Sequence, residues 1–202
     1  MKVVGLSGAQ GAGKSTLLKA LLAKGWELDS FRVSRAVQEQ LGWSSLDVIK
    51  TSPLLMMEFQ EEVFQQKYRR DLGLQTNPAV SLILTERTFA DLAAYTSNWV
   101  WDLVYGDKLA LYAGMEWLSV YISKCARAQN EIYSGVMLLP YMDHVVWEAD
   151  PNRAARSSVD LIMADIDRFI EQKMPITSRV MRLSQKTVND RATEADNFLR
   201  TL

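Results

Sequence analysis

The stretch that decides the fold lies near the amino terminus and reads Gly8-Ala9-Gln10-Gly11-Ala12-Gly13-Lys14-Ser15. It fits the pattern G-x-x-x-x-G-K-[S/T] in full, and it stands between an apolar, β-branched segment, residues 2–7, and a leucine-rich segment, residues 15–24. Glycines permit backbone angles at which successive N–H groups converge on phosphate oxygens, and the following helix N-terminus adds partial positive charge. The sequence therefore predicts a strand, a phosphate-binding loop and a helix, in this order.

The end of this stretch also predicts which groups bind a nucleoside triphosphate. We expect the Lys14 ammonium to reach the β- and γ-phosphates, and the Ser15 hydroxyl to hold Mg²⁺, whose charge offsets that of the triphosphate. The predicted cofactors are therefore ATP and Mg²⁺. The residues expected to bind the nucleotide are Gly8, Ala9, Gln10, Gly11, Ala12, Gly13, Lys14, Ser15 and Thr16.

Segments with strand and helix patterns alternate along the rest of the chain. Strands are indicated at residues 2–7, 26–31, 80–85, 136–139 and 179–183. Helices are indicated at residues 15–24, 34–41, 53–73, from 88 onward, 117–128, 157–170 and after 187. This alternation predicts an α/β fold of three layers, in which helices cover both faces of a mostly parallel five-stranded sheet. Together with the glycine-rich loop, this layout resembles the P-loop NTPase fold. We expect one domain over residues 1–202.

Capping signals mark where four of these helices begin. A Ser or Thr accepts a hydrogen bond from the first helical turn, and proline is favoured at the first helical position. The four signals are Ser52-Pro53, Thr88 with Asp91, Ser157 with Asp160, and Thr187 with Asp190.

Glu86 and Arg87 directly follow the most apolar predicted strand, residues 80–85. In a parallel sheet the carboxyl ends of the strands meet at one edge, where ligands bind, so both side chains should lie near Lys14. A carboxylate there can bind Mg²⁺, and an arginine can hold an acceptor or a phosphate. The alternative is an exposed ion pair at the start of the next helix.

Residues 150–156 read Asp-Pro-Asn-Arg-Ala-Ala-Arg and precede a capped helix. Arginines on a closing lid stabilise the charge that phosphoryl transfer spreads over the equatorial oxygens, and the lid excludes water. We therefore predict a lid over roughly residues 141–157, with Arg153 and Arg156 as catalytic groups. The alternative is a solvated loop at the start of a helix.

Taken together, these motifs resemble those of the P-loop kinases of the thymidylate kinase and deoxynucleoside kinase group, with the ribosylnicotinamide kinases as more distant relatives. Thr85-Glu86-Arg87-Thr88 is similar to the acidic-Arg-[S/T] signature that these kinases carry after their third strand, and residues 133–140 are similar to their Tyr-Asp-x-Val-x-x-Leu-Pro strand. Residues 148–153 stand in the place of their lid, although Pro151-Asn152 replaces the usual glycine. The similarity spans most of the chain.

The resemblance implies an ATP- and Mg²⁺-dependent kinase that transfers the γ-phosphoryl group to a nucleoside or nucleotide. It implies that Glu86 serves Mg²⁺ and the catalytic geometry and that Arg87 holds the acceptor. Asp29 is the nearest candidate for a further acid found near the second strand in the family. A hydroxyl acceptor benefits from a carboxylate that takes its proton, so Asp29 and Glu86 are both candidate bases.

The acceptor should bind between the helix that begins at Pro53 and the helix that follows Arg87. Base stacking could involve one of seven aromatic side chains in this region, although aromatic residues at helical spacing more often belong to the core. These residues are Phe59, Phe64, Tyr68, Phe89, Tyr95, Trp99 and Trp101.

One subgroup of these kinases, the phage kinases that phosphorylate 5-hydroxymethyluracil within DNA, acts on a polymeric acceptor. A different class, a P-loop regulatory ATPase or GTPase switch without an acceptor, is the alternative function.

Composition limits the remaining possibilities. The chain has 202 residues, 23 Lys and Arg against 24 Asp and Glu, and a formal net charge of −1, so attraction to nucleic acid or membrane by overall charge is not implied. Its single cysteine, Cys125, forms no internal disulfide. With no signal-peptide pattern or membrane segment apparent, we expect a cytoplasmic protein, in the host cytoplasm if the chain is phage-encoded. The oligomeric state stays open, and a homodimer is compatible with the sequence.

Overall fold

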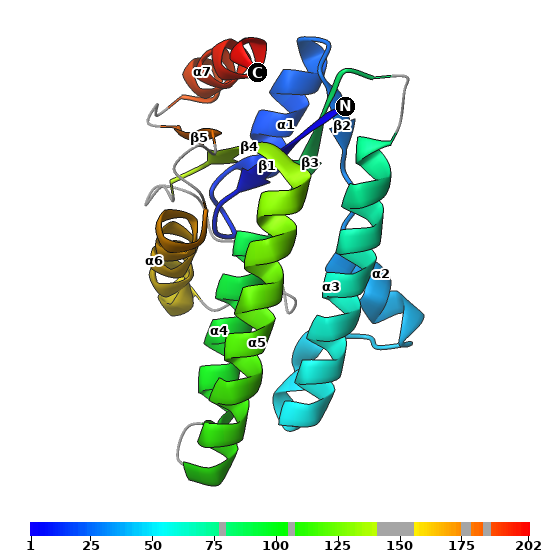
Figure 1. Cartoon of the computed structure of the whole chain (residues 1–202), viewed down its shortest axis with the longest axis vertical. Coiled ribbons are helices and arrows are strands. Elements are labelled where there is room, and N and C mark those ends of the chain that lie inside the picture. Colours follow the sequence, from blue (N-terminus) through cyan, green and yellow to red (C-terminus); the bar gives the residue numbers. More distant parts are fainter. Residues whose placement is uncertain (77–79, 105–107, 141–155, 175–178, 184–186) are drawn as a thin grey trace.

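A five-stranded sheet forms the centre of the computed structural model, in the order β2-β3-β1-β4-β5 (Figure 1). The strands are β1 (Lys2–Ser7), β2 (Glu27–Asp29), β3 (Leu82–Glu86), β4 (Tyr133–Leu138) and β5 (Arg179–Arg182). Each neighbouring pair is parallel. The predicted α/β fold with a five-stranded sheet is therefore confirmed, and among the described residues the sheet is wholly parallel.

The structure describes residues 1–76, 80–104, 108–140, 156–174, 179–183 and 187–202. Most of the predicted lid, residues 141–155, lies outside this part of the chain, and so does Arg153. Within the described ranges, no helix is both long enough and apolar enough to cross a membrane.

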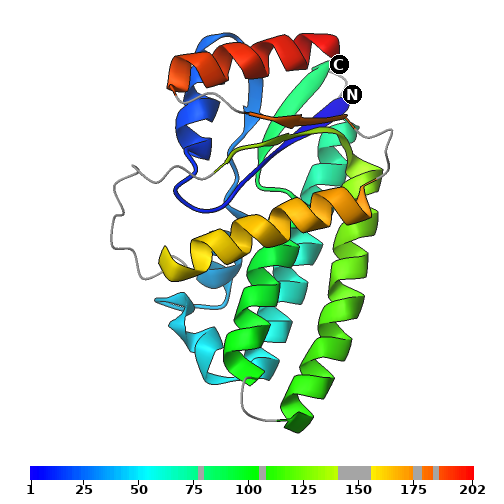
Figure 2. The same cartoon turned by 90° about the vertical axis from the view of Figure 1, so that its left-hand side faces the viewer.

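Helices cover both faces of the sheet (Figures 1 and 2). On one face lie α1 (Lys14–Ala23) and α7 (Val188–Thr201), which pack against each other. On the other lie α3 (Pro53–Gln75), α4 (Phe89–Val104), α5 (Lys108–Ile132) and α6 (Arg156–Lys173). The helix α2 (Val33–Gln40) and the 3₁₀ helix η1 (Leu46–Thr51) pack against α3. The long helices α3, α4 and α5 extend well beyond the sheet.

The apolar residues of the strands divide between two cores because successive side chains point to opposite faces of a sheet. In β1, Val3 joins the core shared with α3 to α6, whereas Val4 and Leu6 join the core shared with α1 and α7. Cys125 is fully buried in the first of these cores. This two-sided burial explains why the strands read as nearly continuous apolar runs.

Three of the four predicted caps are confirmed. Thr187 caps α7 through Asp190, and Ser52 precedes Pro53 at the start of α3. At the start of α4, the Thr88 backbone N–H donates to Asp91 Oδ2 at 2.8 Å. The fourth prediction is wrong, because α6 begins at Arg156 and Ser157 is already a helical residue.

Candidate active site

The phosphate-binding loop connects β1 to α1 at the carboxyl edge of the sheet. Gly8 has φ 148°, and a Cβ there would lie 2.7 Å from the Leu139 carbonyl oxygen, so a side chain would force the loop away from the residue after β4. Gly13, at φ 88°, is left-handed and stands at the N-cap of α1. Both glycines are therefore required by the backbone of the loop.

Lys14 lies under this loop and is 6% exposed. Its ammonium donates to the carbonyl oxygens of Gly8 and Ala9, the latter at 3.0 Å. Burial, helped by the nearby Arg87 charge, lowers the pKa of Lys14 to about 8. The loop thus holds a poorly solvated positive charge, which an anionic ligand would stabilise.

Ser15 and Glu86 lie side by side although they come from α1 and the end of β3. The Ser15 hydroxyl donates to Glu86 Oε1 at 3.2 Å. A hydroxyl and a carboxylate oxygen are ligands that Mg²⁺ accepts, and Mg²⁺ is usually held by one or two such groups together with substrate phosphates. The two residues therefore fit a magnesium ion next to the phosphate loop.

Arg87, the residue after Glu86, has a backbone conformation that few non-glycine residues adopt. Its φ is 66°, in the left-handed region, and its N–H donates to the Leu6 carbonyl oxygen at 2.9 Å. This conformation turns the chain out of β3, and the guanidinium carbon lies 5.0 Å from the centre of the Tyr95 ring. Strained backbone of this kind clusters at functional sites.

Side chains from α4 hold the first part of the phosphate loop. Asp91 is fully buried and accepts hydrogen bonds from the Ser7 hydroxyl at 2.7 Å and from the Gly8 N–H at 3.1 Å. One helical turn later, the Tyr95 hydroxyl accepts a bond from the Gln10 N–H at 2.8 Å. The helix that begins just after Arg87 thus fixes two amides of the loop.

Two other helices hold the remainder of the loop. The Ala9 N–H points to Met163 Sδ of α6 at 2.9 Å. Arg191 of α7, 5% exposed, donates to the Ala12 carbonyl oxygen at 3.0 Å. The loop is therefore positioned by three helices from both faces of the sheet.

A pocket of about 410 Å³ extends from the phosphate loop to an apolar compartment between α3 and α4. Its polar wall includes Lys14, Ser15, Glu86 and Arg87. The lining of the far compartment comprises Leu46, Phe59, Gln60, Val63, Leu92, Tyr95 and Trp99. The pocket thus joins a phosphate site to a space that can receive an apolar or aromatic group.

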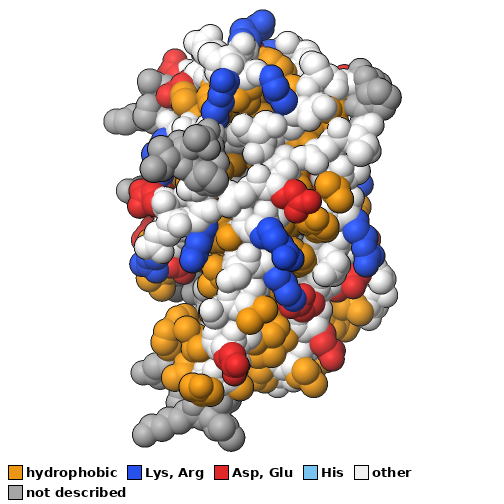
Figure 3. Space-filling view, viewed as in Figure 1, with side chains coloured by type: hydrophobic (Ala, Val, Ile, Leu, Met, Phe, Trp, Pro, Cys, Tyr) orange, Lys and Arg blue, Asp and Glu red, His pale blue; other side chains and the backbone are white. Residues whose placement is uncertain are grey.

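Basic groups outnumber acidic ones among the described residues that line the pocket. The basic residues are Lys14, Arg32, Arg35, Lys67 and Arg87, and the acidic ones are Glu86 and Asp91. On the face of the molecule drawn in Figure 3, Lys and Arg are instead interspersed with acidic and apolar side chains over the described surface. The described lining of the pocket therefore carries an excess of positive groups, which favours anionic ligands.

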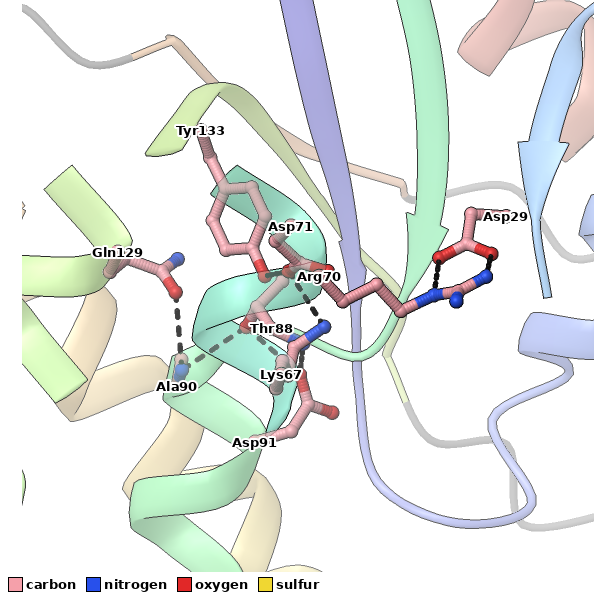
Figure 4. Close-up of polar contacts among 9 residues, drawn as sticks. All are labelled: Asp29, Lys67, Arg70, Asp71, Thr88, Ala90, Asp91, Gln129 and Tyr133. Carbon is pink, nitrogen blue, oxygen red and sulfur yellow. Dashed lines mark hydrogen bonds and ion pairs between the residues drawn. The ribbon is translucent and has the colours of Figure 1, made fainter. Parts of the chain in front are cut away.

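The helix α3 takes part in two ion pairs, one within the helix and one with β2 (Figure 4). Lys67 lies 2.9 Å from Asp71 Oδ2, both side chains are almost fully buried, and the Tyr133 hydroxyl donates to the same oxygen at 2.5 Å. Arg70 forms a two-point ion pair with Asp29 of β2, and its Nε–H donates at 2.7 Å. Because Tyr133 belongs to β4 and Asp29 to β2, these contacts join α3, which carries the acceptor side of the pocket, to both strands.

The structure therefore brings together Lys14, Ser15, Glu86 and Arg87, as the sequence predicted for this edge of the sheet. Asp29 stands apart, because both of its oxygens face Arg70 and it does not line the described pocket. Arg156 is the first residue of α6. Of the seven aromatic candidates, Phe59, Tyr95 and Trp99 line the pocket.

Sequence reasoning missed several residues that shape the site. Asp91 was expected only as a helix cap, and Gln60, Met163 and Arg191 gave no signal that set them apart from other helical residues. The spacing of Asp91 and Tyr95, four residues apart, does place them on the same face of a helix, and could have indicated that both reach the loop.

Comparison with known proteins shows the fold. No protein-family model and no curated protein matches the chain. Similar solved structures include three whose matches each cover 99% of this chain. A NadR protein in complex with NR matches with a TM-score of 0.66 and 14% sequence identity over 50% of its own chain. Deoxyadenosine kinase from M. mycoides matches with a TM-score of 0.65 and 15% identity over 100% of its chain, and thymidylate kinase from Candida albicans with a TM-score of 0.65 and 13% identity over 91% of its chain. The chain spans about half the length of the NadR protein.

These similarities confirm the resemblance at the level of the fold: the chain has the P-loop kinase fold that deoxyadenosine kinase, thymidylate kinase and NadR share. The phage DNA kinase subgroup stays a prediction.

Proposed function

We propose that this protein is an ATP- and Mg²⁺-dependent phosphotransferase that moves the γ-phosphoryl group to a nucleoside or nucleotide acceptor. The observation that carries the proposal is the continuity of one pocket, from the loop that holds Lys14 to the compartment lined by Phe59 and Trp99. A site that only hydrolysed a triphosphate would need room for water, whereas this pocket has space for a second, partly apolar molecule. The shared fold of nucleoside and nucleotide kinases supports the same conclusion.

In this proposal the loop and Lys14 bind the triphosphate, and Ser15 and Glu86 hold Mg²⁺. Bound Mg²⁺ would neutralise part of the phosphate charge. Lys14 stabilises the charge on the β- and γ-phosphates, and the backbone amides of the loop orient them. Arg153 and Arg156, on the predicted lid, stay candidates for stabilising the transferred group.

The Glu86 carboxylate has two oxygens, so in this proposal one serves Mg²⁺ and the other is the acceptor-side base. Glu86 lines the pocket, whereas the Asp29 carboxylate is engaged by Arg70. For a hydroxyl acceptor, Glu86 accepts the hydroxyl proton as the acceptor oxygen attacks the γ-phosphorus, the bond from the γ-phosphorus to the β,γ-bridging oxygen breaks, and ADP leaves. Arg87 holds the acceptor through its guanidinium, which can bind a phosphate or a base oxygen.

The far compartment supplies the contacts for a nucleobase. Phe59 is stacked against Trp43 at 5.6 Å between ring centres, and it lies on the pocket wall together with Trp99. Gln60 is 4% exposed and offers an amide that both donates and accepts. An aromatic wall and one amide are what a planar heterocycle with polar edges requires.

The test is a panel of acceptors incubated with γ-labelled ATP and Mg²⁺. The panel contains free nucleosides, nucleoside monophosphates, ribosylnicotinamide and DNA that carries 5-hydroxymethyluracil. We expect label transfer to one class, and loss of that transfer by orders of magnitude in Lys14→Ala, while Lys19→Ala on the exposed side of α1 serves as the matched control. Transfer to the modified DNA alone would place the protein with the phage kinases. Release of free phosphate at one rate with every acceptor and with none would support the regulatory ATPase instead.

A further inference from the structure

Tyr95 contacts both halves of the pocket, and its hydroxyl interacts with Arg87 as well as with Gln10. It lies in the second turn of α4 and is 8% exposed. Its hydroxyl accepts the Gln10 N–H at 2.8 Å, while its ring face meets the Arg87 guanidinium at 5.0 Å. Gln10 belongs to the phosphate loop and Arg87 to the acceptor side, so a single rigid ring spans the distance between them.

The surroundings of Tyr95 make this link stiff. Asp91, one turn earlier on α4, bonds the Gly8 N–H and the Thr88 N–H with its two carboxylate oxygens. Two loop amides, those of Gly8 and Gln10, are thus fixed to the first two turns of α4, which begins two residues after the strained residue Arg87. Burial raises the pKa of the Tyr95 hydroxyl, so the group stays neutral and keeps a lone pair directed at Gln10.

We propose that Tyr95 is a positioning residue that sets the distance between the phosphate loop and the acceptor-binding Arg87. Its hydroxyl holds Gln10 in place before a nucleotide arrives, and its ring holds the guanidinium. This inference rests on the proposed function for the role of Arg87, but the effect on the loop does not require that an acceptor be known. A preorganised loop binds the triphosphate more tightly because less conformational freedom is lost on binding.

The first test removes only the hydroxyl. In Tyr95→Phe we expect faster amide hydrogen exchange in residues 8–13 of the nucleotide-free protein, with exchange in β4 unchanged. Binding of a non-hydrolysable ATP analogue with Mg²⁺ should weaken about two- to tenfold, the range for one hydrogen bond. Tyr68→Phe is the matched control, since the Tyr68 hydroxyl bonds Glu131 on another part of the surface.

The second test separates the ring from the hydroxyl. Tyr95→Leu should give the same loop exchange as Tyr95→Phe and should shift the NMR signal of the Arg87 Nε–H further than Tyr95→Phe does, because it removes the ring face as well as the hydroxyl, and both contact Arg87. A general loss of stability would move exchange throughout the sheet and would not distinguish the two variants in this way.

Three results would overturn the proposal. These are unchanged loop exchange and unchanged analogue binding in Tyr95→Phe, tighter analogue binding in that variant, or an unprotected Gln10 amide in the wild-type protein. Protection of the Gln10 amide is measured in the wild-type protein, so it tests the proposal even if the variants do not fold. Because all readouts use the nucleotide-free protein or the ATP analogue, a failure to find a phosphoryl acceptor would contradict the proposed function and leave the effect of Tyr95 on the phosphate loop standing.

Discussion

Two residues of the pocket hold conformations or charges that the folded chain stabilises poorly. Lys14 keeps its ammonium out of water, and Arg87 keeps a left-handed backbone. Each feature costs free energy in the nucleotide-free protein, and each places a positive group where an anion would bind. Ligand binding should therefore release part of this cost, which leads to two predictions at the scale of single residues.

The first concerns the charge of Lys14. Its pKa near 8 means that the amine becomes neutral as the pH rises above that value, whereas bound phosphate would favour the protonated form. The dissociation constant of the ATP analogue should therefore rise above pH 8, by up to about tenfold per pH unit, and binding near pH 8.5 should take up a proton. Calorimetry in two buffers of different ionisation enthalpy measures both.

Lys14→Arg is the control, because its guanidinium stays charged throughout this range. A pH-independent affinity of the wild-type protein between pH 7 and 9.5 would contradict the prediction.

The lowered pKa of Lys14 also affects the stability of the folded protein. Between pH 8 and the ordinary value of 10.5, the unfolded chain binds more protons at Lys14 than the folded one, so this group makes the free energy of unfolding rise with pH.

The second concerns the backbone of Arg87. Glycine adopts φ 66° without strain and alanine does not, although both variants lose the guanidinium. Arg87→Gly should therefore be more stable than Arg87→Ala by about 1 kcal/mol in urea denaturation. Equal stability of the two variants would show that the left-handed backbone carries no strain.

The sequence was sufficient to predict the residues of the site that belong to continuous motifs. Glu86 and Arg87 stand at the end of β3, Lys14 and Ser15 follow the loop after β1, and the parallel sheet brings the ends of these strands together. Tyr95 could be named only as one of seven aromatic candidates, and Gln60 could not be named at all, because which face of α3 or α4 meets the pocket depends on packing between helices distant in the chain.

At the scale of the elements, the contact between β1 and the start of α4 determines where Arg87 lies. Gly5 in the middle of β1 faces the Thr88 side chain, and a Cβ at Gly5 would lie 2.5 Å from Thr88 Cγ2. The Thr88 hydroxyl must at the same time reach Asp91, at 2.9 Å. The close approach of strand and turn is therefore possible only because β1 has no side chain at this point.

A double-mutant cycle tests this contact. Gly5→Ala should destabilise the protein by about 1–3 kcal/mol, as overpacking does. Thr88→Ser removes the clashing methyl group but keeps the hydroxyl, so the double variant should recover more than half of the loss. Urea denaturation of the four proteins measures the coupling. Additive losses would contradict the contact.

Most of the elements could be predicted, with errors at their ends. Residues 2–7 form the predicted strand without change, whereas the strand predicted at 80–85 runs from Leu82 to Glu86 and so takes the acidic residue into its last position. The predicted strand at 26–31 shortens to three residues, and its Asp29 faces α3 because Arg70 pairs with it. Ends of this kind are set by pairing partners that are far apart in the chain.

In the molecule as a whole, the alternation of strands and helices and the burial of apolar side chains determine the fold, and the fold determines where the site lies. Two apolar cores, one on each face, hold a parallel sheet whose carboxyl edge gathers the loop, the acid and the arginine. The order of the strands could not be read from the sequence, because the apolar runs of β3 and β4 are equally suited to a central place. The phosphoryl acceptor could not be predicted from the sequence either, because its identity depends on the detailed shape of the pocket.

The most direct test of the account is a calorimetric titration of the folded protein with a non-hydrolysable ATP analogue and Mg²⁺. We expect one binding site per chain, loss of binding in Lys14→Ala and unchanged binding in Lys19→Ala. Saturation at 100 times the dissociation constant should also stabilise the protein by about 2.7 kcal/mol, which a thermal melt would show. Absence of heat and of any shift in Tm, with wild-type protein whose fold is intact, would contradict the assignment of the Gly8–Ser15 loop as a triphosphate site.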